Sequence, residues 1–351
     1  MKGIRALARH LDISIGTVSK ALNGRFDINS ETRERVLKAA AELGYVPNQA
    51  GRALRQGATR TVGFMIESNQ AAPTDSDNFF IAVFDGVQTV LRRHHLDLIV
   101  LPCASDEDPG EYLARIVARG LVDAVIISAT RRNDPRVPLL EKAGVPFVAL
   151  GRSGDVTHPW LELDFEGVAK RSVDRLVERG HRRIAVALPA TELNLGNLFL
   201  RGYKEALKQH GISFVPALAI KIESSEAGGH QLGASLLELE PQPTAVILSY
   251  ELPAVGLYRA LGEVGVVPGK DLAVIAFRES PVTRHLLPRM TSFTTSLRDL
   301  GVALGEMLLT TMADFAESYP DTPVQRIWPM ELVEGDSDPD HHPRKGTDLS
   351  K

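Results

Sequence analysis

The sequence has little cysteine and no long apolar run, and each absence narrows the class of protein. Cys103 is the single cysteine among 351 residues, so an intrachain disulfide is excluded, which fits a reducing compartment. The N-terminus lacks the apolar core of a signal peptide, and no segment approaches the length of a membrane span. We therefore expect a cytoplasmic protein, and an exported sugar-binding protein is disfavoured.

The sequence also lacks the motifs of common catalytic and metal sites. It contains no glycine-rich loop with P-loop spacing and no histidine or cysteine pair with zinc-ligand spacing. His94-His95 and His341-His342 are isolated pairs, which are typical of solvated surface. No signature supports a Ser-His-Asp site. We therefore expect no enzyme activity, no metal and no cofactor.

Charge is divided unevenly along the chain. Residues 1–60 hold 11 Lys and Arg against 5 Asp and Glu, a net charge of +6, and the remainder has 29 against 39, or −10. A basic segment on an acidic body suits a polyanionic partner for the first 60 residues alone. A basic solvated surface is the plainer alternative when charge is considered by itself.

Helical periodicity begins almost at the N-terminus. Residues 4–11 carry one apolar stripe, Asp12 tolerates a turn, and Ser14 offers an N-cap for a second helix. The apolar face of that second helix consists of Val18, Ala21 and Leu22. Two short helices with a tight turn are typical of a helix-turn-helix, whose second helix enters the major groove, or of an ordinary αα-hairpin.

A third helix is expected over 31–43, capped by Asn29 or Ser30 and closed by Gly44. Together these segments closely resemble the LacI/GalR family of bacterial transcription regulators. The matching stretches are residues 14–23, 31–36 and 43–48. The resemblance implies an α/β protein with an N-terminal three-helix helix-turn-helix headpiece, a hinge helix and a two-lobed, periplasmic-binding-protein-like sensor domain.

Domain boundaries follow from composition and from the resemblance. Beyond residue 60, continuous apolar runs alternate with amphipathic helices, which predicts parallel sheets covered on both faces and too many strands for one sheet. The resemblance implies three crossings between the lobes, near 160, 290 and 320. The expected parts are the headpiece 1–46, the hinge helix 47–58, the N-lobe 60–159 plus 291–319, the C-lobe 160–290 plus 320–334, and a disordered tail 335–351 without a tetramerisation helix.

The resemblance also assigns residues to the DNA site. Base reading falls to Ile15, Gly16 and Lys20, of which only Lys20 can donate hydrogen bonds from its side chain to guanine. Leu54 matches the leucine that wedges into the minor groove at the operator centre, with a plain linker leucine as the alternative. Much of the specificity would then come from DNA deformability. The other candidates are Ser14, Thr17, Ser19, Asn23, Asn29, Thr32 and Asn48.

The expected effector site departs from the family pattern. Phe199 stands where an arginine is common, Tyr250-Glu251 where Asn-Asp is common, and Arg278 where an aspartate is common. The features shared with the family are Phe79-Phe80, Arg152 and Asp164. Aromatic rings and guanidinium groups suit a sugar or glycoside, and Arg278 also suits a sugar acid. The alternative is a lost effector site and a constitutive regulator.

The sequence thus predicts a dimeric transcription regulator, acting as a repressor on a near-palindromic operator. A carbohydrate-like effector between the lobes would change the lobe angle, the hinge helices and so the operator affinity. Two other classes remain open from the residues alone: a carbohydrate-binding protein without DNA function, and an α/β enzyme. The basic headpiece argues against the first, and activity screening would test the second.

Overall fold

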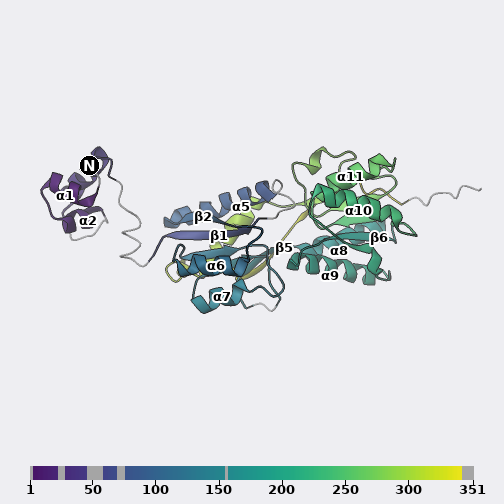
Figure 1. The fold of residues 1–351 in the computed structure, drawn as a ribbon, viewed down its shortest axis with the longest axis horizontal. Helices are drawn as coiled ribbons and strands as arrows, with labels where there is room; N and C mark the ends of the chain where they lie inside the picture. The colour runs from purple at the N-terminus through teal and green to yellow at the C-terminus, as the bar shows by residue number, and fades with distance from the viewer. Residues whose placement is uncertain (1–2, 23–27, 46–57, 69–75, 155–156, 342–351) are drawn as a thin grey trace, which may run out of the picture. The chain divides into compact units, whose positions relative to one another are not determined.

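The structure is a computed structural model that describes residues 3–22, 28–45, 58–68, 76–154 and 157–341. The chain divides into two compact units, Met1–Arg60 and Thr61–Lys351, each with its own interior (Figure 1). Among the described residues, no helix is both long enough and apolar enough to span a membrane.

The described part of the first unit packs three helices around small apolar side chains. Its helices are α1 (Ile4–Leu11), α2 (Ile15–Leu22) and α3 (Ser30–Glu42). Leu7, Val18 and Val36, one from each helix, are buried in a common core. Asp12 ends α1 in the left-handed conformation with φ 54°, which turns the chain into α2. The expected helix-turn-helix headpiece is confirmed, whereas the hinge helix at 47–58 falls almost wholly outside the described residues.

The N-lobe of the second unit is a six-stranded parallel sheet in the order β11-β5-β4-β3-β1-β2. Its strands are β1 (Thr61–Glu67), β2 (Asp97–Cys103), β3 (Ala124–Ile127), β4 (Phe147–Leu150), β5 (Trp160–Leu163) and β11 (Gln325–Trp328). Its helices are α5 (Ser76–Leu91), α6 (Pro109–Ala118), α7 (Arg136–Ala143) and α12 (Leu297–Thr310), with 3-10 turns at Arg92–His94 and Ala316–Ser318. Both faces of the sheet are covered, as the continuous apolar strands predict.

Helices α5 and α12, far apart in sequence, pack together on one face of the N-lobe sheet. Glycine allows this approach, because a Cβ on Gly86 would overlap the backbone of α12 and a Cβ on Gly301 would overlap the carbonyl of Val83. Helices α6 and α7 cover the other face through Leu113, Ile116 and Leu140. The return of the chain through α12 confirms that the N-lobe is discontinuous in sequence.

The C-lobe is a four-stranded parallel sheet in the order β7-β6-β8-β9. Its strands are β6 (Ile184–Pro189), β7 (Ala219–Ile222), β8 (Ala245–Leu248) and β9 (Ala273–Ala276). Its helices are α8 (Phe165–Glu178), α9 (Asn194–Gln209), α10 (Glu226–Glu238) and α11 (Pro253–Glu263), with 3-10 turns at Pro216–Leu218 and Thr283–His285. Figure 1 shows α8 and α9 on one side of this sheet and α10 and α11 on the other.

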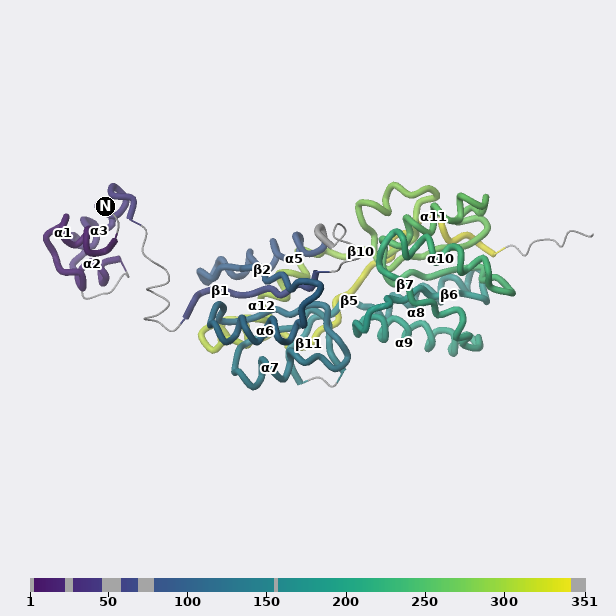
Figure 2. The backbone as a smooth tube through the Cα atoms, in the orientation of Figure 1, coloured from purple at the N-terminus to yellow at the C-terminus, as the bar shows by residue number. Residues whose placement is uncertain are grey.

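The lobe boundaries differ from the prediction at two crossings. Strand β5 begins at Trp160 but pairs with β4 and β11, so 160–163 belongs to the N-lobe sheet. Strand β11 pairs with β5, so 325–328 also lies in the N-lobe rather than the C-lobe. A two-stranded ribbon of β10 (Ser292–Thr294) and β12 (Glu331–Val333) accompanies the crossings that follow β9 and β11 (Figure 2). Short apolar runs alone carry no information on which sheet they join, which explains the error.

The predicted disordered tail is also wrong over its first part. Ser337 and Asp338 are buried, and the Ser337 hydroxyl donates to the Val274 carbonyl at 2.6 Å. The carboxylate of Asp338 pairs with Arg175 and lies 3.2 Å from Arg179 Nε. Polar side chains therefore fasten residues 335–341 to the C-lobe, although the segment shows no apolar periodicity. Residues 342–351 fall outside the described ranges.

Candidate functional site

The first candidate site is the outward face of α2 in the headpiece. Val18 and Ala21 are buried in the core, so the helix turns Ile15, Gly16 and Lys20 to solvent. The Ile15 side chain is 42% exposed, an unusual position for a large apolar group. A Cβ on Gly16 would meet nothing closer than the Ser14 hydroxyl at 3.5 Å, so packing does not require glycine there. The three predicted base-reading residues thus share one exposed face.

The other DNA candidates divide into helix caps and surface groups. The Ser14 hydroxyl accepts a hydrogen bond from the Thr17 amide at 3.0 Å, and the Asn29 side chain accepts one from the Glu31 amide at 2.8 Å. Both caps leave amides at helix N-termini, where phosphates bind. Thr17, Ser19 and Thr32 are partly exposed. The predicted candidates Asn23, Asn48 and Leu54 lie outside the described residues.

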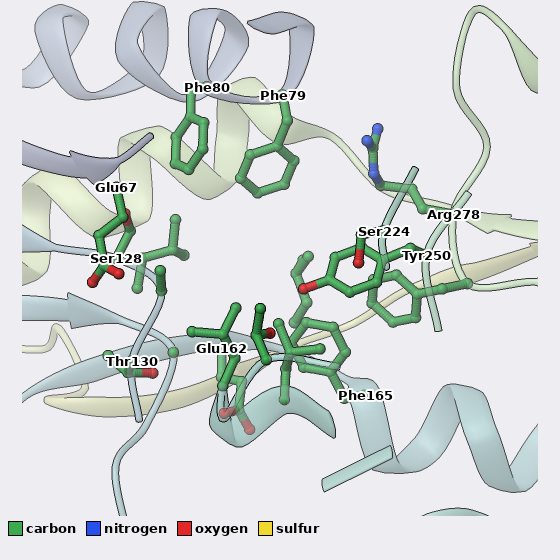
Figure 3. Close-up of a pocket in the computed structure, with 18 of the residues that line it drawn as sticks. Glu67, Phe79, Phe80, Ser128, Thr130, Glu162, Phe165, Ser224, Tyr250 and Arg278 are labelled. Carbon is green, nitrogen blue, oxygen red and sulfur yellow. The ribbon is translucent and has the colours of Figure 1, made fainter. Parts of the chain in front are cut away.

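The second candidate site is a cavity of about 280 Å³ at the carboxyl ends of the strands of both sheets (Figure 3). Ligands of open α/β sheets bind at such strand ends. The N-lobe lining consists of Glu67, Phe79, Phe80, Ser128, Ala129, Thr130, Leu150, Gly151, Glu162 and Leu163. The C-lobe lining consists of Phe165, Thr191, Leu193, Leu195, Ser224, Tyr250, Glu251, Leu252, Phe277 and Arg278.

Four predicted effector residues come together on this lining. Phe79, Tyr250, Glu251 and Arg278 all line the cavity, although they are widely separated in sequence. The Arg278 guanidinium forms an ion pair with Glu251 and lies 5.4 Å from the centre of the Phe79 ring. Because Phe79 is in the N-lobe and Arg278 in the C-lobe, this cation–π contact joins the lobes beside the cavity.

Three predicted effector residues do not line the cavity. Phe199 is fully buried and makes an edge-to-face contact with Phe277, with ring centres 6.1 Å apart. Asp164 caps α8 by accepting the Gly167 amide at 2.9 Å. Arg152 lies behind the lining, where its Nε is 3.1 Å from Glu162 and its guanidinium pairs with Glu166 of α8. Each of the three supports the site from outside rather than facing a ligand.

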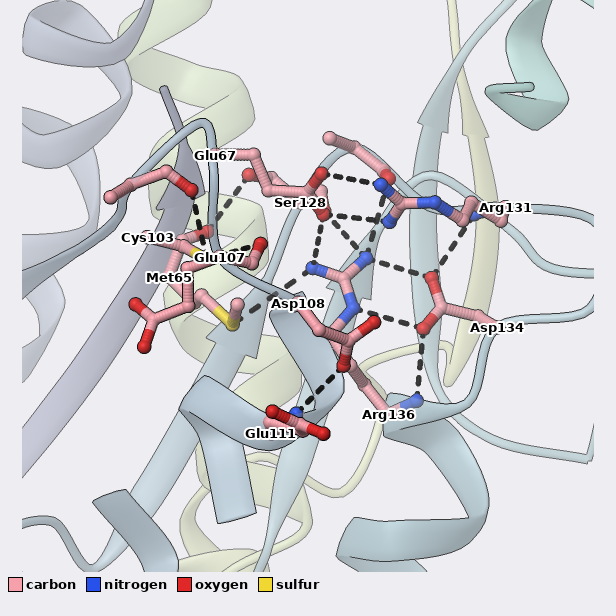
Figure 4. Close-up of polar contacts among 12 residues, drawn as sticks. Met65, Glu67, Cys103, Glu107, Asp108, Glu111, Ser128, Arg131, Asp134 and Arg136 are labelled. Atoms are coloured by element: carbon pink, nitrogen blue, oxygen red, sulfur yellow. Dashed lines mark hydrogen bonds and ion pairs between the residues drawn. The ribbon is translucent and has the colours of Figure 1, made fainter. Parts of the chain in front are cut away.

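The sequence reasoning missed most of the polar lining. Glu67 is the last residue of β1, and its carboxylate lies 2.6 Å from Arg131 and 3.0 Å from Arg136 (Figure 4). Arg136 is fully buried and pairs at 2.7 Å with the buried Asp134. Several of the missed residues stand at or just after the end of a parallel strand, which is the sequence signal that identifies them. These are Glu67, Ser128, Gly151, Thr191 and Ser224.

Glu162 has the most perturbed carboxyl group on the lining. Burial raises the pKa of Glu162 to about 7, although the Arg152 guanidinium and amide oppose the rise. Its arginine partner is shared with Glu166, which also pairs with Arg201 of α9. A buried carboxylate with a shared cation is only partly compensated.

We expect Glu162→Gln to stabilise the protein in a pH-dependent way. A folded-state pKa of about 7, above the ordinary value of 4.5, makes the wild type lose stability as pH rises from 4.5 to 7. The increase in the free energy of unfolding caused by Glu162→Gln should therefore be absent at pH 4.5 and reach up to about 3 kcal/mol above pH 7. Chemical denaturation at several pH values measures it. Glu238→Gln, an exposed carboxylate on α10, controls for the lost charge, and a gain that does not vary with pH would contradict the prediction.

Comparison with known proteins identifies the family to which the chain belongs. Residues 4–48 match the family described as bacterial regulatory proteins, lacI family, and residues 173–337 match a periplasmic binding protein-like domain. The chain is 32% identical over 337 residues to the HTH-type transcriptional regulator AglR of Rhizobium meliloti, covering 94% of this chain and 92% of AglR.

Solved structures agree with this result. A complex of the transcriptional regulator CelR with cellobiose has a TM-score of 0.71 and 27% identity, over 96% of this chain and 100% of that one. The fold alone is also similar to a lac repressor dimer bound to operator and the anti-inducer ONPF, with a TM-score of 0.81 and 22% identity over 95% and 98% of the two chains. The chain belongs to the lacI family of bacterial regulatory proteins.

Proposed function

We propose that the protein is a transcription regulator, acting as a repressor, whose operator affinity changes when a carbohydrate-like effector occupies the cavity. The observation that carries the proposal is that one chain combines an outward-facing α2 with a cavity lined from both lobes. The protein acts in the cytoplasm, without a resident cofactor, and binds its ligand rather than transforming it.

The DNA partner is a near-palindromic operator bound by a homodimer. A headpiece this small buries too little surface for tight specific binding alone, and two copies related by a two-fold axis match two half-sites. The relative solved on operator DNA is described as a dimer.

The test combines operator selection with a ligand panel. Duplexes that bind the full chain are selected from random sequence, and their release is followed by fluorescence anisotropy as neutral mono- and disaccharides are added. Cellobiose, the ligand of the solved relative, is the first member of the panel. Failure to select any duplex, or an unchanged operator affinity with every sugar, would contradict the proposal.

We expect Lys20→Ala to weaken operator binding by about 1–3 kcal/mol, because it removes the hydrogen-bond donor expected at a base edge. Discrimination should also be lost at one position in each half-site. Anisotropy on the selected duplex and on its single-base variants measures both effects. Lys208→Ala removes the same charge from an exposed site on α9 and serves as the control. Equal weakening on all base variants would mean that Lys20 contacts phosphate.

The lining favours a neutral ligand over a sugar acid. Arg278, on which an anionic ligand depends, is already paired with Glu251, and the described residues of the lining carry three carboxyl groups against one guanidinium. We expect a neutral sugar to bind at least about tenfold more tightly than its uronic acid. Glu251→Gln should narrow this gap by freeing the charge of Arg278. Calorimetry on matched pairs measures it, and tighter binding of the acids to wild type would restore the anionic hypothesis.

A further inference from the structure

The hydroxyl groups of Ser128 and Thr130, on the N-lobe side of the cavity, already donate hydrogen bonds within the protein. The Ser128 hydroxyl donates to the Met65 carbonyl at 2.9 Å, and the Thr130 hydroxyl donates to the Arg152 carbonyl at 3.3 Å. A buried sugar hydroxyl needs a partner of its own, since burial without a hydrogen bond is costly. Among the described residues, this side of the cavity therefore offers few hydrogen-bond donors to a polyhydroxylated ring.

The charged groups on the lining also form ion pairs with other residues of the protein. Glu67 receives two hydrogen bonds from Arg131, at 2.6 and 2.8 Å, and lies 3.0 Å from Arg136 (Figure 4). Glu162 is held by Arg152, and Glu251 by Arg278. The charges serve largely to balance one another, which leaves less hydrogen-bonding capacity than the number of polar residues suggests.

Aromatic and aliphatic side chains supply the rest of the surface. Figure 3 shows Phe79 and Phe80 reaching into the cavity from α5, with Phe165 across from them. The Phe79 and Phe80 rings meet edge to face at 5.2 Å, and Phe165 stacks on Phe277 at 4.5 Å. This fixed apolar surface is larger than one sugar ring needs, because a sugar has only its C–H faces to place against it.

A small polar region lies on the C-lobe side. The Tyr250 side chain points into the cavity, where it forms a hydrogen bond with Ser224, and the exposed Thr191 also lies on the lining. A hydroxyl group can donate one hydrogen bond and also accept others, so this pair keeps hydrogen-bonding capacity for a sugar. The cavity volume of about 280 Å³ is at the lower end for small-molecule sites and limits the ligand to about two rings. The two regions differ in character, so the two parts of the ligand should differ in the same way.

We propose that the effector is a glycoside made of one sugar ring and an apolar aglycone, with the aglycone against Phe79 and Phe80 and the sugar beside Tyr250. This inference rests on the proposed function, since it specifies the ligand of the same site. A second sugar ring would bring several further hydroxyls to the region where Ser128, Thr130 and Glu67 are already paired. An apolar ring there costs no hydrogen bonds and covers aromatic surface.

Matched glycosides test the proposal on the full chain. Phenyl and methyl glycosides of glucose, galactose, mannose and xylose, in both anomers, are compared by calorimetry together with cellobiose. We expect the phenyl compound of the recognised sugar to bind at least about tenfold more tightly than the methyl compound, from the extra apolar area that it buries. It should also bind more tightly than cellobiose. A phenyl-to-methyl ratio near 1, or tighter binding of cellobiose, would overturn the proposal.

Variants locate the effect within the cavity. Phe79→Ala should reduce the phenyl-to-methyl ratio to about 3 or less, by removing one aglycone wall. Phe80→Leu, a smaller change, should lower the ratio less. Phe214→Ala removes a partly buried ring in the C-lobe, outside the lining, and should leave the ratio unchanged. An unchanged ratio in Phe79→Ala, with normal thermal unfolding, would place the aglycone elsewhere and overturn the assignment.

The same panel separates this inference from the proposed function. Sugars that release DNA with equal phenyl and methyl affinities would overturn the aglycone site and leave the regulator intact. Phenyl glycosides that bind tightly without changing operator affinity would support the ligand class and count against the regulatory role. No binding by any glycoside would count against both.

Discussion

Removal of the headpiece will abolish specific operator binding while leaving the sensor unit folded. Residues 1–60 carry the net charge of +6 and the exposed face of α2, whereas the remainder of the chain has a net charge of −10. A chain of residues 61–351 therefore loses its base contacts and repels the phosphates. Operator affinity should fall by about a thousandfold or more, to the level of non-specific binding or below.

The sensor unit should survive this truncation because it shares no core with the headpiece. The core formed by Leu7, Val18 and Val36 lies wholly in the first unit, and the three larger cores lie wholly in the second. Circular dichroism, sedimentation and ligand calorimetry should show a folded, ligand-binding dimer. Operator affinity within tenfold of the full chain would place the DNA site in the second unit instead.

Arg136→Met will destabilise the sensor unit by about 3–5 kcal/mol, because removal of one partner leaves a buried charge without compensation. Arg136 and Asp134 are both fully buried, joined by hydrogen bonds of 2.7 and 2.9 Å. Burial alone would raise the pKa of Asp134, but Arg136 and two backbone amides more than offset it, and the pKa is lowered. Denaturant unfolding at neutral pH measures the loss.

A double variant separates the pair from the packing of its parts. Asp134→Leu combined with Arg136→Met removes both charges, so it should recover much of the stability lost in Arg136→Met. Arg131→Met, which also contacts Glu67 but is partly exposed, is the matched control and should cost less. A loss below about 1 kcal/mol in Arg136→Met would mean that Asp134 takes up a proton or water at little cost.

The headpiece could be predicted from sequence because its signals are local. The Ser14 hydroxyl accepts a hydrogen bond from the amide three residues later, and the Asn29 side chain accepts one from the amide two residues later. Asp12 supplies the turn between the first two helices. Such contacts depend on sequence spacing alone, and the alternation of strands and helices in the sensor unit is equally local. Helices with weaker patterns are harder to delimit from sequence, such as α10, whose sequence includes three glycines.

The cavity was predicted less well because its properties depend on contacts between distant residues. Four of the residues predicted by matching positions to the family line the cavity: Phe79, Tyr250, Glu251 and Arg278. The match could not show that Glu251 forms an ion pair with Arg278, 27 residues away. Phe199 reads as a pocket aromatic in sequence, yet the packing of α9 turns it into the core. The pairing of Glu67 with Arg131 and Arg136 joins residues 64 or more positions apart, and no periodicity announces it.

The three crossings between the lobes also determine how far a rotation of the lobes displaces the far end of the N-lobe. They are tied to one another, since the Asp164 amide donates to the Trp328 carbonyl at 3.1 Å and the Thr295 hydroxyl donates to the Pro329 carbonyl at 3.0 Å. These linked segments form a hinge beside the cavity. Strand β1 runs from the cavity at Glu67 to Thr61, roughly 20 Å away, so tilting the N-lobe by about 5° swings Thr61 by roughly 2 Å relative to the C-lobe. A rotation of the lobes that is too small to open the cavity therefore produces a larger displacement at Thr61, the residue that follows the headpiece unit in the chain.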